Sequence, residues 1–146
     1  MKLYYFNVAA KGEAIRLLLT HSQTEFEDIR LSGDSWQEFK ADKTKCKFGQ
    51  LPVLELDGEY HSQSVSILRY LGALNGYYPE DAKLRFRIDE LSDLLATDFF
   101  TPLIKNIVFT KDAEEKYVHP SRSICVTSHL TRSDFLLPNF KSFPEI

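Results

Sequence analysis

Cysteine is scarce in this chain of 146 residues, which has only Cys46 and Cys125. The two cysteines are far apart and form no CxxC motif, and they stand in no metal-ligand spacing with the four histidines. We therefore expect free thiols and a cytoplasmic location, without a structural disulfide or a bound metal.

The sequence also lacks a strong excess of charge of one sign and any long hydrophobic run. Eighteen basic residues against 21 acidic residues give a net charge of −3, which provides no electrostatic basis for binding nucleic acid or an anionic membrane. No apolar stretch is long enough to span a bilayer, and residues 1–6 run into Asn7 without the hydrophobic region of a signal peptide. These absences favour a soluble globular protein.

The first half of the chain alternates strand and helix patterns. Residues 36–47 are lysine-rich and show no clear period, whereas Asp57-Gly58 is typical of a hairpin turn. The strands are expected at residues 2–6, 26–30, 53–56 and 59–61, and the clearest helices at residues 13–21 and 65–74. The order β-α-β-α-β-β-α predicts an α/β, thioredoxin-like domain with a mixed four-stranded sheet and helices on both faces.

A change of pattern at residues 75–80 divides the chain into two predicted domains. Asn75-Gly76 ends the last helix of the first domain, residues 1–76, and residues 77–80 form a linker. From Asp81 to about Val108, leucines and isoleucines recur at helical spacing. We expect residues 81–146 to form an incomplete, truncated all-α domain.

The residues best suited to bind a ligand are Ser62-Gln63-Ser64, eleven positions after Leu51-Pro52-Val53. The hairpin would bring these polar residues to the start of the following helix, beside the backbone of the proline loop. Hydroxyl, amide and helix-N-terminal donors suit a small ligand with a carboxylate and an amino group.

Together with other motifs, this segment resembles the sigma class of cytosolic glutathione transferases, which includes the glutathione-dependent prostaglandin D synthases. The resemblance covers roughly residues 1–110. Its motifs are Tyr4-Tyr5-Phe6, Lys11-Gly12-Glu13-Ala14-Ile15-Arg16, Trp36, Lys40, Gly49-Gln50-Leu51-Pro52-Val53-Leu54, Ser62-Gln63-Ser64 and Arg87-Ile88-Asp89-Glu90.

The resemblance implies that Tyr5 is the catalytic residue. A thiol with a pKa near ~8.5 is mostly protonated at neutral pH, so a hydroxyl that donates to the sulfur of glutathione raises the reactive thiolate fraction. Tyr4 would point to the opposite face of the strand and pack there. From the residues alone, the favoured interpretation of Tyr5 is a core tyrosine in an aromatic-rich strand.

The same resemblance assigns the binding residues. Gln63 and Ser64 would hold the γ-glutamyl group, and Lys40 would meet the glycyl carboxylate. As isolated residues, Ser62 or Ser64 could be a helix cap and Lys40 a solvated lysine. The implied glutathione-binding residues are Trp36, Lys40, Gln50, Leu51, Pro52 (after a cis peptide bond), Gln63 and Ser64.

Several positions depart from the pattern of the class. Lys11 stands where an arginine is usual, so the charge remains but the forked geometry is lost. Thr97 occupies the place of an aspartate that reaches across the dimer, and Asp98 follows it. The acidic cluster that binds a divalent ion in some prostaglandin synthases is incomplete, which again predicts no metal.

The similarity fades after about Lys116. A threonine and an aspartate at Thr131 and Asp134 resemble a capping box, or match it by chance. Loss of part of the helical bundle is expected to expose apolar side chains of the second domain. These are Leu94, Phe99, Phe100, Leu103, Ile107 and Phe109.

The resemblance implies a detoxifying transferase that uses reduced glutathione as co-substrate and a small apolar electrophile as second substrate, with prostaglandin isomerisation as one such reaction. It also implies a homodimer. The alternative is a non-catalytic binding or structural protein, similar to the lens crystallins of this class. A glutaredoxin-like oxidoreductase is disfavoured because residues 7–10, just after the first strand, contain no cysteine.

Overall fold

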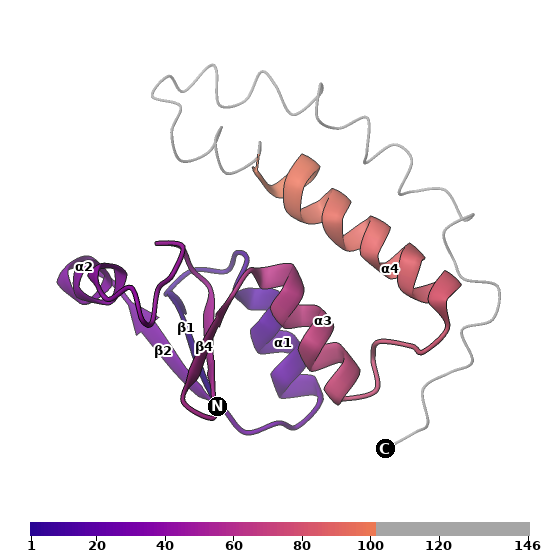
Figure 1. Ribbon diagram of the computed structural model, residues 1–146, viewed down its shortest axis with the longest axis horizontal. Helices are drawn as coiled ribbons and strands as arrows, with labels where there is room; N and C mark the ends of the chain where they lie inside the picture. The colour runs from indigo at the N-terminus through magenta and orange to yellow at the C-terminus, as the bar shows by residue number, and fades with distance from the viewer. Residues whose placement is uncertain (102–146) are drawn as a thin grey trace. The chain divides into compact units, whose positions relative to one another are not determined.

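The computed structural model describes residues 1–101 (Figure 1). The chain divides after Ser92 into two units. Within the described residues, no helix has both the length and the apolar character needed to cross a membrane.

The first unit is built on a four-stranded mixed sheet with the strand order β2-β1-β3-β4. Strands β1 and β2 run parallel, whereas β1 with β3 and β3 with β4 are antiparallel. The strands are β1 (Lys2–Phe6), β2 (Glu27–Leu31), β3 (Val53–Leu56) and β4 (Glu59–Ser62). The sheet has the predicted thioredoxin-like order.

Helices pack on both faces of this sheet, as the sequence predicts. Helices α1 (Glu13–His21) and α3 (Ser64–Leu74) lie side by side on one face (Figure 1). Helix α2 (Gly33–Ala41) packs on the other face through Phe39. The core beneath α1 and α3 contains Leu3, Ile15, Leu19, Leu54, Ile67 and Leu71. Each of these buried aliphatic side chains contributes about 1.5–3 kcal/mol of hydrophobic stabilisation.

Helix α2 begins before the lysine-rich segment 36–47, in which the sequence shows no clear period. Ser32 and Ser35 form a reciprocal capping box at its start. Only Phe39 is buried in the helix, so the apolar period was too weak to reveal it. After α2, Asp42 accepts hydrogen bonds from Thr44 and pairs with Lys45, and these contacts lower the pKa of Asp42 to about 2.

The predicted long helix after Asp81 is not uniform. Helix α4 (Ala82–Asp93) is followed by a π-helical segment, η1 (Leu94–Phe99). Asp89 of α4 accepts from Arg69 Nε of α3 at 2.5 Å and from the Tyr78 hydroxyl at 2.9 Å. The pKa of Asp89 is lowered, chiefly by the hydrogen bond from Arg69. The division after Ser92 lies beyond the predicted linker, whose role as a domain boundary stays a prediction.

The apolar residues of the second region are only partly described. Leu94, Phe99 and Phe100 are half-buried, in contrast to the exposure expected for them. Leu103, Ile107 and Phe109 lie outside the described residues, as does the motif at Thr131 and Asp134.

Tyr4 on β1 forms a hydrogen bond with the carboxylate of Glu55 on β3. Its hydroxyl donates to Glu55 Oε2 at 2.5 Å, and this bond is the main reason why the pKa of Glu55 is lowered from 4.5. A carboxyl group whose pKa is lower in the folded state than in the unfolded state stabilises the fold at a pH above its unfolded-state pKa. This stabilisation is lost as the pH falls through the folded-state pKa.

We expect Tyr4→Phe to weaken the acid sensitivity that Glu55 confers. Between about pH 5 and pH 3, the free energy of unfolding should fall less steeply in this variant than in the parent. Urea denaturation at several pH values measures this slope. Tyr70→Phe, at a 47% exposed tyrosine, is the control. Identical slopes for Tyr4→Phe and the parent would contradict the assignment.

Candidate glutathione site

Tyr5 is held at the end of β1, on the face opposite Tyr4. It is 6% exposed, and its hydroxyl oxygen accepts the backbone N–H of Lys11 at 3.1 Å. Burial raises the pKa of Tyr5, while the backbone N–H groups of Lys11 and Gly12 and the charge of Arg16 oppose this rise. The phenol therefore keeps its proton at neutral pH, and its O–H can donate to a ligand.

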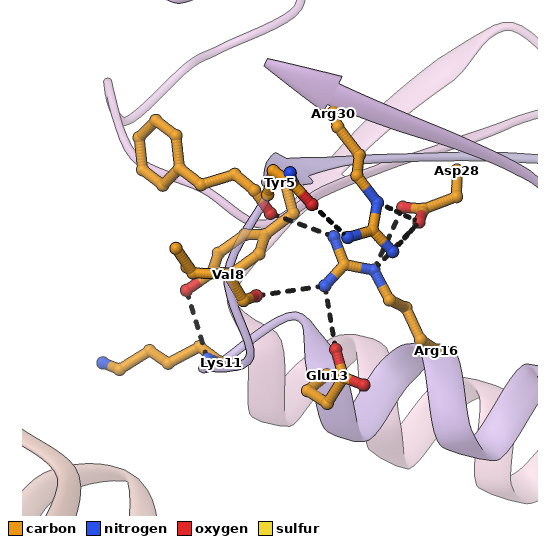
Figure 2. Close-up of polar contacts among 9 residues, drawn as sticks. Tyr5, Val8, Lys11, Glu13, Arg16, Asp28 and Arg30 are labelled. Carbon is orange, nitrogen blue, oxygen red and sulfur yellow. Dashed lines mark hydrogen bonds and ion pairs between the residues drawn. The ribbon is translucent and has the colours of Figure 1, made fainter. Parts of the chain in front are cut away.

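The loop that presents Lys11 to Tyr5 is anchored by the buried Arg16 of α1. Its Nη2 donates to the carbonyl of Phe6 at 3.1 Å and its Nη1 to the carbonyl of Val8 at 3.2 Å (Figure 2). The side chain of Lys11 extends away from this guanidinium, so only its backbone takes part. Arg16 thus fixes the start of the turn that follows β1.

Asp28 on β2 completes this network. Both of its carboxylate oxygens accept from Arg16 Nε at 3.1 Å, and one also accepts from Arg30 Nε at 2.8 Å (Figure 2). Arg30 Nη1 in turn donates to the side chain of Asn7 at 2.5 Å. Burial alone would lower the pKa of Arg16, but its bonds to Glu13 and Asp28 outweigh burial and raise it.

Sequence reasoning did not assign a role to Arg16 or Asp28. The available signal was Arg16 itself, a charged residue inside the apolar run of α1. A buried cation has to find partners, but the pattern does not reveal that the partners lie in β2 and the loop after β1.

A polar cavity of about 30 Å³ lies at the N-terminus of α3. One water molecule needs roughly 10–15 Å³ of such a cavity. The cavity therefore has room for a small group at one end of a ligand, such as a carboxylate. The side-chain oxygen of Ser62 is buried there and has no hydrogen-bond partner within the described part of the chain. The lining residues are Lys11, Gln50, Leu51, Pro52, Ser62, Gln63 and Ser64.

The backbone around this cavity has two unusual conformations. The Leu51–Pro52 peptide bond is cis, as the resemblance implies. Gln63 adopts φ 79° and ψ 105°, a conformation that costs a non-glycine residue on the order of 1–3 kcal/mol and is concentrated at functional sites. Gln63 is the N-cap residue of α3 and Ser64 is its first residue, so neither Ser62 nor Ser64 is the helix cap.

The N-terminus of α3 suits an anion. No side chain caps this helix, and a helix N-terminus presents backbone N–H groups and the positive end of the helix dipole. Ser64 belongs to the same cavity wall. This end of the site can hold a carboxylate.

Trp36 and Lys40 lie together on α2, outside the cavity wall. Lys40 Nζ is 5.6 Å from the centroid of the Trp36 ring, and Phe6 packs edge-on against that ring at 5.4 Å. A Cβ placed on Gly49 would lie 3.7 Å from Lys40 Cε, so this lysine reaches the loop that carries Gln50.

The structure thus gathers most of the predicted site residues. Gln50, Leu51, Pro52, Gln63 and Ser64 share the cavity wall, which also includes Lys11. Tyr5 meets this wall through the backbone of Lys11.

Asp98 lies in the second unit, where it accepts from the Thr97 hydroxyl at 3.1 Å. Among residues 1–101, no group of three or more histidine, cysteine, aspartate or glutamate side chains could hold a metal ion.

Comparison with protein families identifies the first part of the chain. Residues 1–73, half of the chain, match the family described as glutathione S-transferase, N-terminal domain. The chain belongs to the glutathione S-transferase family.

Two glutathione S-transferases illustrate how similar the chain is to its relatives. Glutathione S-transferase 1 of Ascaris suum is 42% identical over 99 residues, which are 65% of this chain and 47% of the relative. A glutathione S-transferase of Anopheles gambiae is 40% identical over 92 residues, which are 63% of this chain and 44% of the relative. The chain therefore spans about half the length of the curated relatives it matches.

Solved structures show the same fold. A Nu-class enzyme from Haemonchus contortus is 36% identical, with a TM-score of 0.60 over 73% of this chain and 48% of its own. Prostaglandin synthase D of Nilaparvata lugens is also 36% identical, with a TM-score of 0.63 over 79% of this chain and 56% of its own. A monomeric glutathione S-transferase from Necator americanus is 28% identical, with a TM-score of 0.73 over 88% and 65%. These relatives support the family without singling out the sigma class.

Proposed function

We propose that this chain binds reduced glutathione and activates its thiol for attack on a small apolar electrophile. The observation that carries this proposal is the polar cavity at the N-terminus of α3, with a buried tyrosine hydroxyl beside its wall. The cavity suits the α-carboxylate end of the tripeptide, and the Tyr5 hydroxyl is a hydrogen-bond donor for the sulfur. Glutathione serves as co-substrate, and no metal takes part in the proposed reaction.

Each residue of the site has a defined role in this proposal. Ser64 and the N-terminus of α3 bind the γ-glutamyl carboxylate, and the Gln63 amide binds the same group of the ligand. The backbone of Leu51, next to cis-Pro52, pairs with the cysteinyl part of glutathione. Gln50 makes a further contact with the ligand.

The remaining residues act at the two ends of the ligand. Trp36 and Lys40 close over the glycyl end, where the ammonium meets the second carboxylate. Lys11 supplies positive charge near the thiolate. Asp98 would approach the amino group of the ligand from a second subunit.

We infer a sigma-type transferase that acts in cytoplasmic detoxification as a homodimer. The likeness to an insect protein titled prostaglandin synthase D supports prostaglandin isomerisation as one reaction. The monomeric relative from Necator americanus makes the oligomeric state a point to measure.

Calorimetric titration of the full chain with reduced glutathione tests the site. We expect saturable binding near one site per chain and an affinity about ten- to a hundredfold weaker for Ser64→Ala, because a hydrogen bond to a charged group contributes about 1.5–3 kcal/mol. Ser66→Ala, two positions further along α3 at an exposed residue, is the matched control.

Equal affinity in Ser64→Ala and Ser66→Ala would contradict the assignment of Ser64. Binding without turnover of any electrophile would favour the non-catalytic alternative, a binding or structural protein. No binding by a folded sample would contradict the proposed function as a whole.

A further inference from the structure

Gly12 lies against the ring of Tyr5. A Cβ added to Gly12 would lie 2.4 Å from Tyr5 Cδ1, 2.5 Å from Cγ and 3.0 Å from Cβ. Two of these distances are shorter than real Cβ contacts allow, so any side chain at residue 12 would have to displace the tyrosine or the loop.

The conformation of the backbone does not explain the glycine. Gly12 is the N-cap residue of α1 and has φ −81° and ψ −20°, values that any L-residue adopts. The requirement for a residue without a side chain therefore comes from the neighbouring ring.

The ring itself has little freedom to move. Tyr5 is 6% exposed, and the atoms nearest to Gly12 include Cγ and Cβ, which are close to the β1 backbone. The Arg16 guanidinium lies 5.6 Å from the ring centroid, and the hydroxyl accepts from Lys11 N at 3.1 Å. Displacement of the ring would therefore move the hydroxyl away from Lys11.

We propose that Gly12 is a positioning residue for Tyr5: its lack of a side chain lets the start of α1 approach the ring and sets the place of the hydroxyl. This inference rests on the proposed function, in which that hydroxyl donates to the glutathione sulfur. Gly12 acts through Tyr5 and touches no reacting atom.

The variant Gly12→Ala tests this inference, with Gly72→Ala as the matched control. A Cβ at Gly72 would make an ordinary contact, 3.5 Å from Tyr78 Cβ, in α3. In Gly12→Ala we expect kcat/KM with an aryl halide electrophile to fall about tenfold or more, because a displacement near 1 Å can cost up to about a hundredfold. The pH profile of kcat/KM should shift to higher pH, and the Kd of glutathione should change less than about twofold. Gly72→Ala should match the parent.

A double-mutant cycle with Tyr5→Phe separates positioning from a general structural effect. If Gly12 acts through the hydroxyl, Gly12→Ala should cause little further loss of kcat/KM in the Tyr5→Phe background. Additive losses would overturn the inference. So would normal kinetics in Gly12→Ala when Tyr5→Phe is impaired. Unchanged turnover in Tyr5→Phe alone would overturn the proposed role of Tyr5, and this inference with it.

Failure of Gly12→Ala to fold would also be informative. The double variant Gly12→Ala/Tyr5→Ala removes the ring atoms that the new Cβ would meet. Recovery of folding, followed by the fluorescence of Trp36, supports the contact. Failure to recover, when Tyr5→Ala alone folds, overturns it.

Discussion

Tyr5→Phe is expected to lower turnover by about ten- to a hundredfold at neutral pH while the affinity for glutathione changes less than about twofold. One hydrogen bond to a charged sulfur contributes about 1.5–3 kcal/mol, which corresponds to about one to two units in the pKa of the bound thiol. Removal of the hydroxyl should raise that pKa and reduce the thiolate fraction. In the proposed binding mode, other residues contact the two ends of glutathione, so binding should persist.

The pH dependence of kcat/KM measures this effect most directly, since it reports the ionisation of the essential thiol. Tyr4→Phe is the matched control, because it removes the same hydroxyl from the adjacent residue on the opposite face of β1. Equal turnover in Tyr5→Phe and the parent would rule out Tyr5 as the donor.

Arg16→Met is expected to reduce the free energy of unfolding by up to about 3–5 kcal/mol, since it removes the buried partner of a partly buried ion pair. The side chain of Arg16 is 7% exposed, and its loss would leave Asp28 and the carbonyls of Phe6 and Val8 without these donors. Urea denaturation followed by the fluorescence of Trp36, the single tryptophan, measures the first unit.

Arg30→Met provides the comparison, because Arg30 pairs with the same carboxylate but is 45% exposed. Exposed ion pairs contribute about 0–1 kcal/mol, so this variant should remain close to the parent. Equal losses in the two variants would show that burial does not distinguish the two arginines.

Much of the first domain could be read from local patterns. The alternation of side chains along a strand predicted that Tyr4 and Tyr5 lie on opposite faces of β1, and Asp57-Gly58 predicted the hairpin between β3 and β4. Helix α2 was poorly predicted because only Phe39 is buried in it. The change to a π-helix at Leu94 carries no periodic signal that a local pattern could reveal.

The site was predicted through resemblance more than through chemistry. Gln63 and Ser64 have no pattern that distinguishes a ligand contact from a helix start. In the structure, Gln63 has a positive φ at the head of α3 and shares a cavity wall with Leu51 and cis-Pro52. That arrangement supports a binding role, because strained backbone conformations cost free energy and are concentrated at functional sites.

Order of elements, turn positions and the side of the strand on which each tyrosine lies follow from the sequence, because they depend on neighbours within a few residues. The position of the Tyr5 hydroxyl does not follow from the sequence. It depends on Arg16 reaching Asp28, on Lys11 turning its N–H back to the hydroxyl and on the absence of a side chain at Gly12. These contacts join β1, α1 and β2, and they exist only when the three elements are packed together, which is why the tertiary structure alone reveals them.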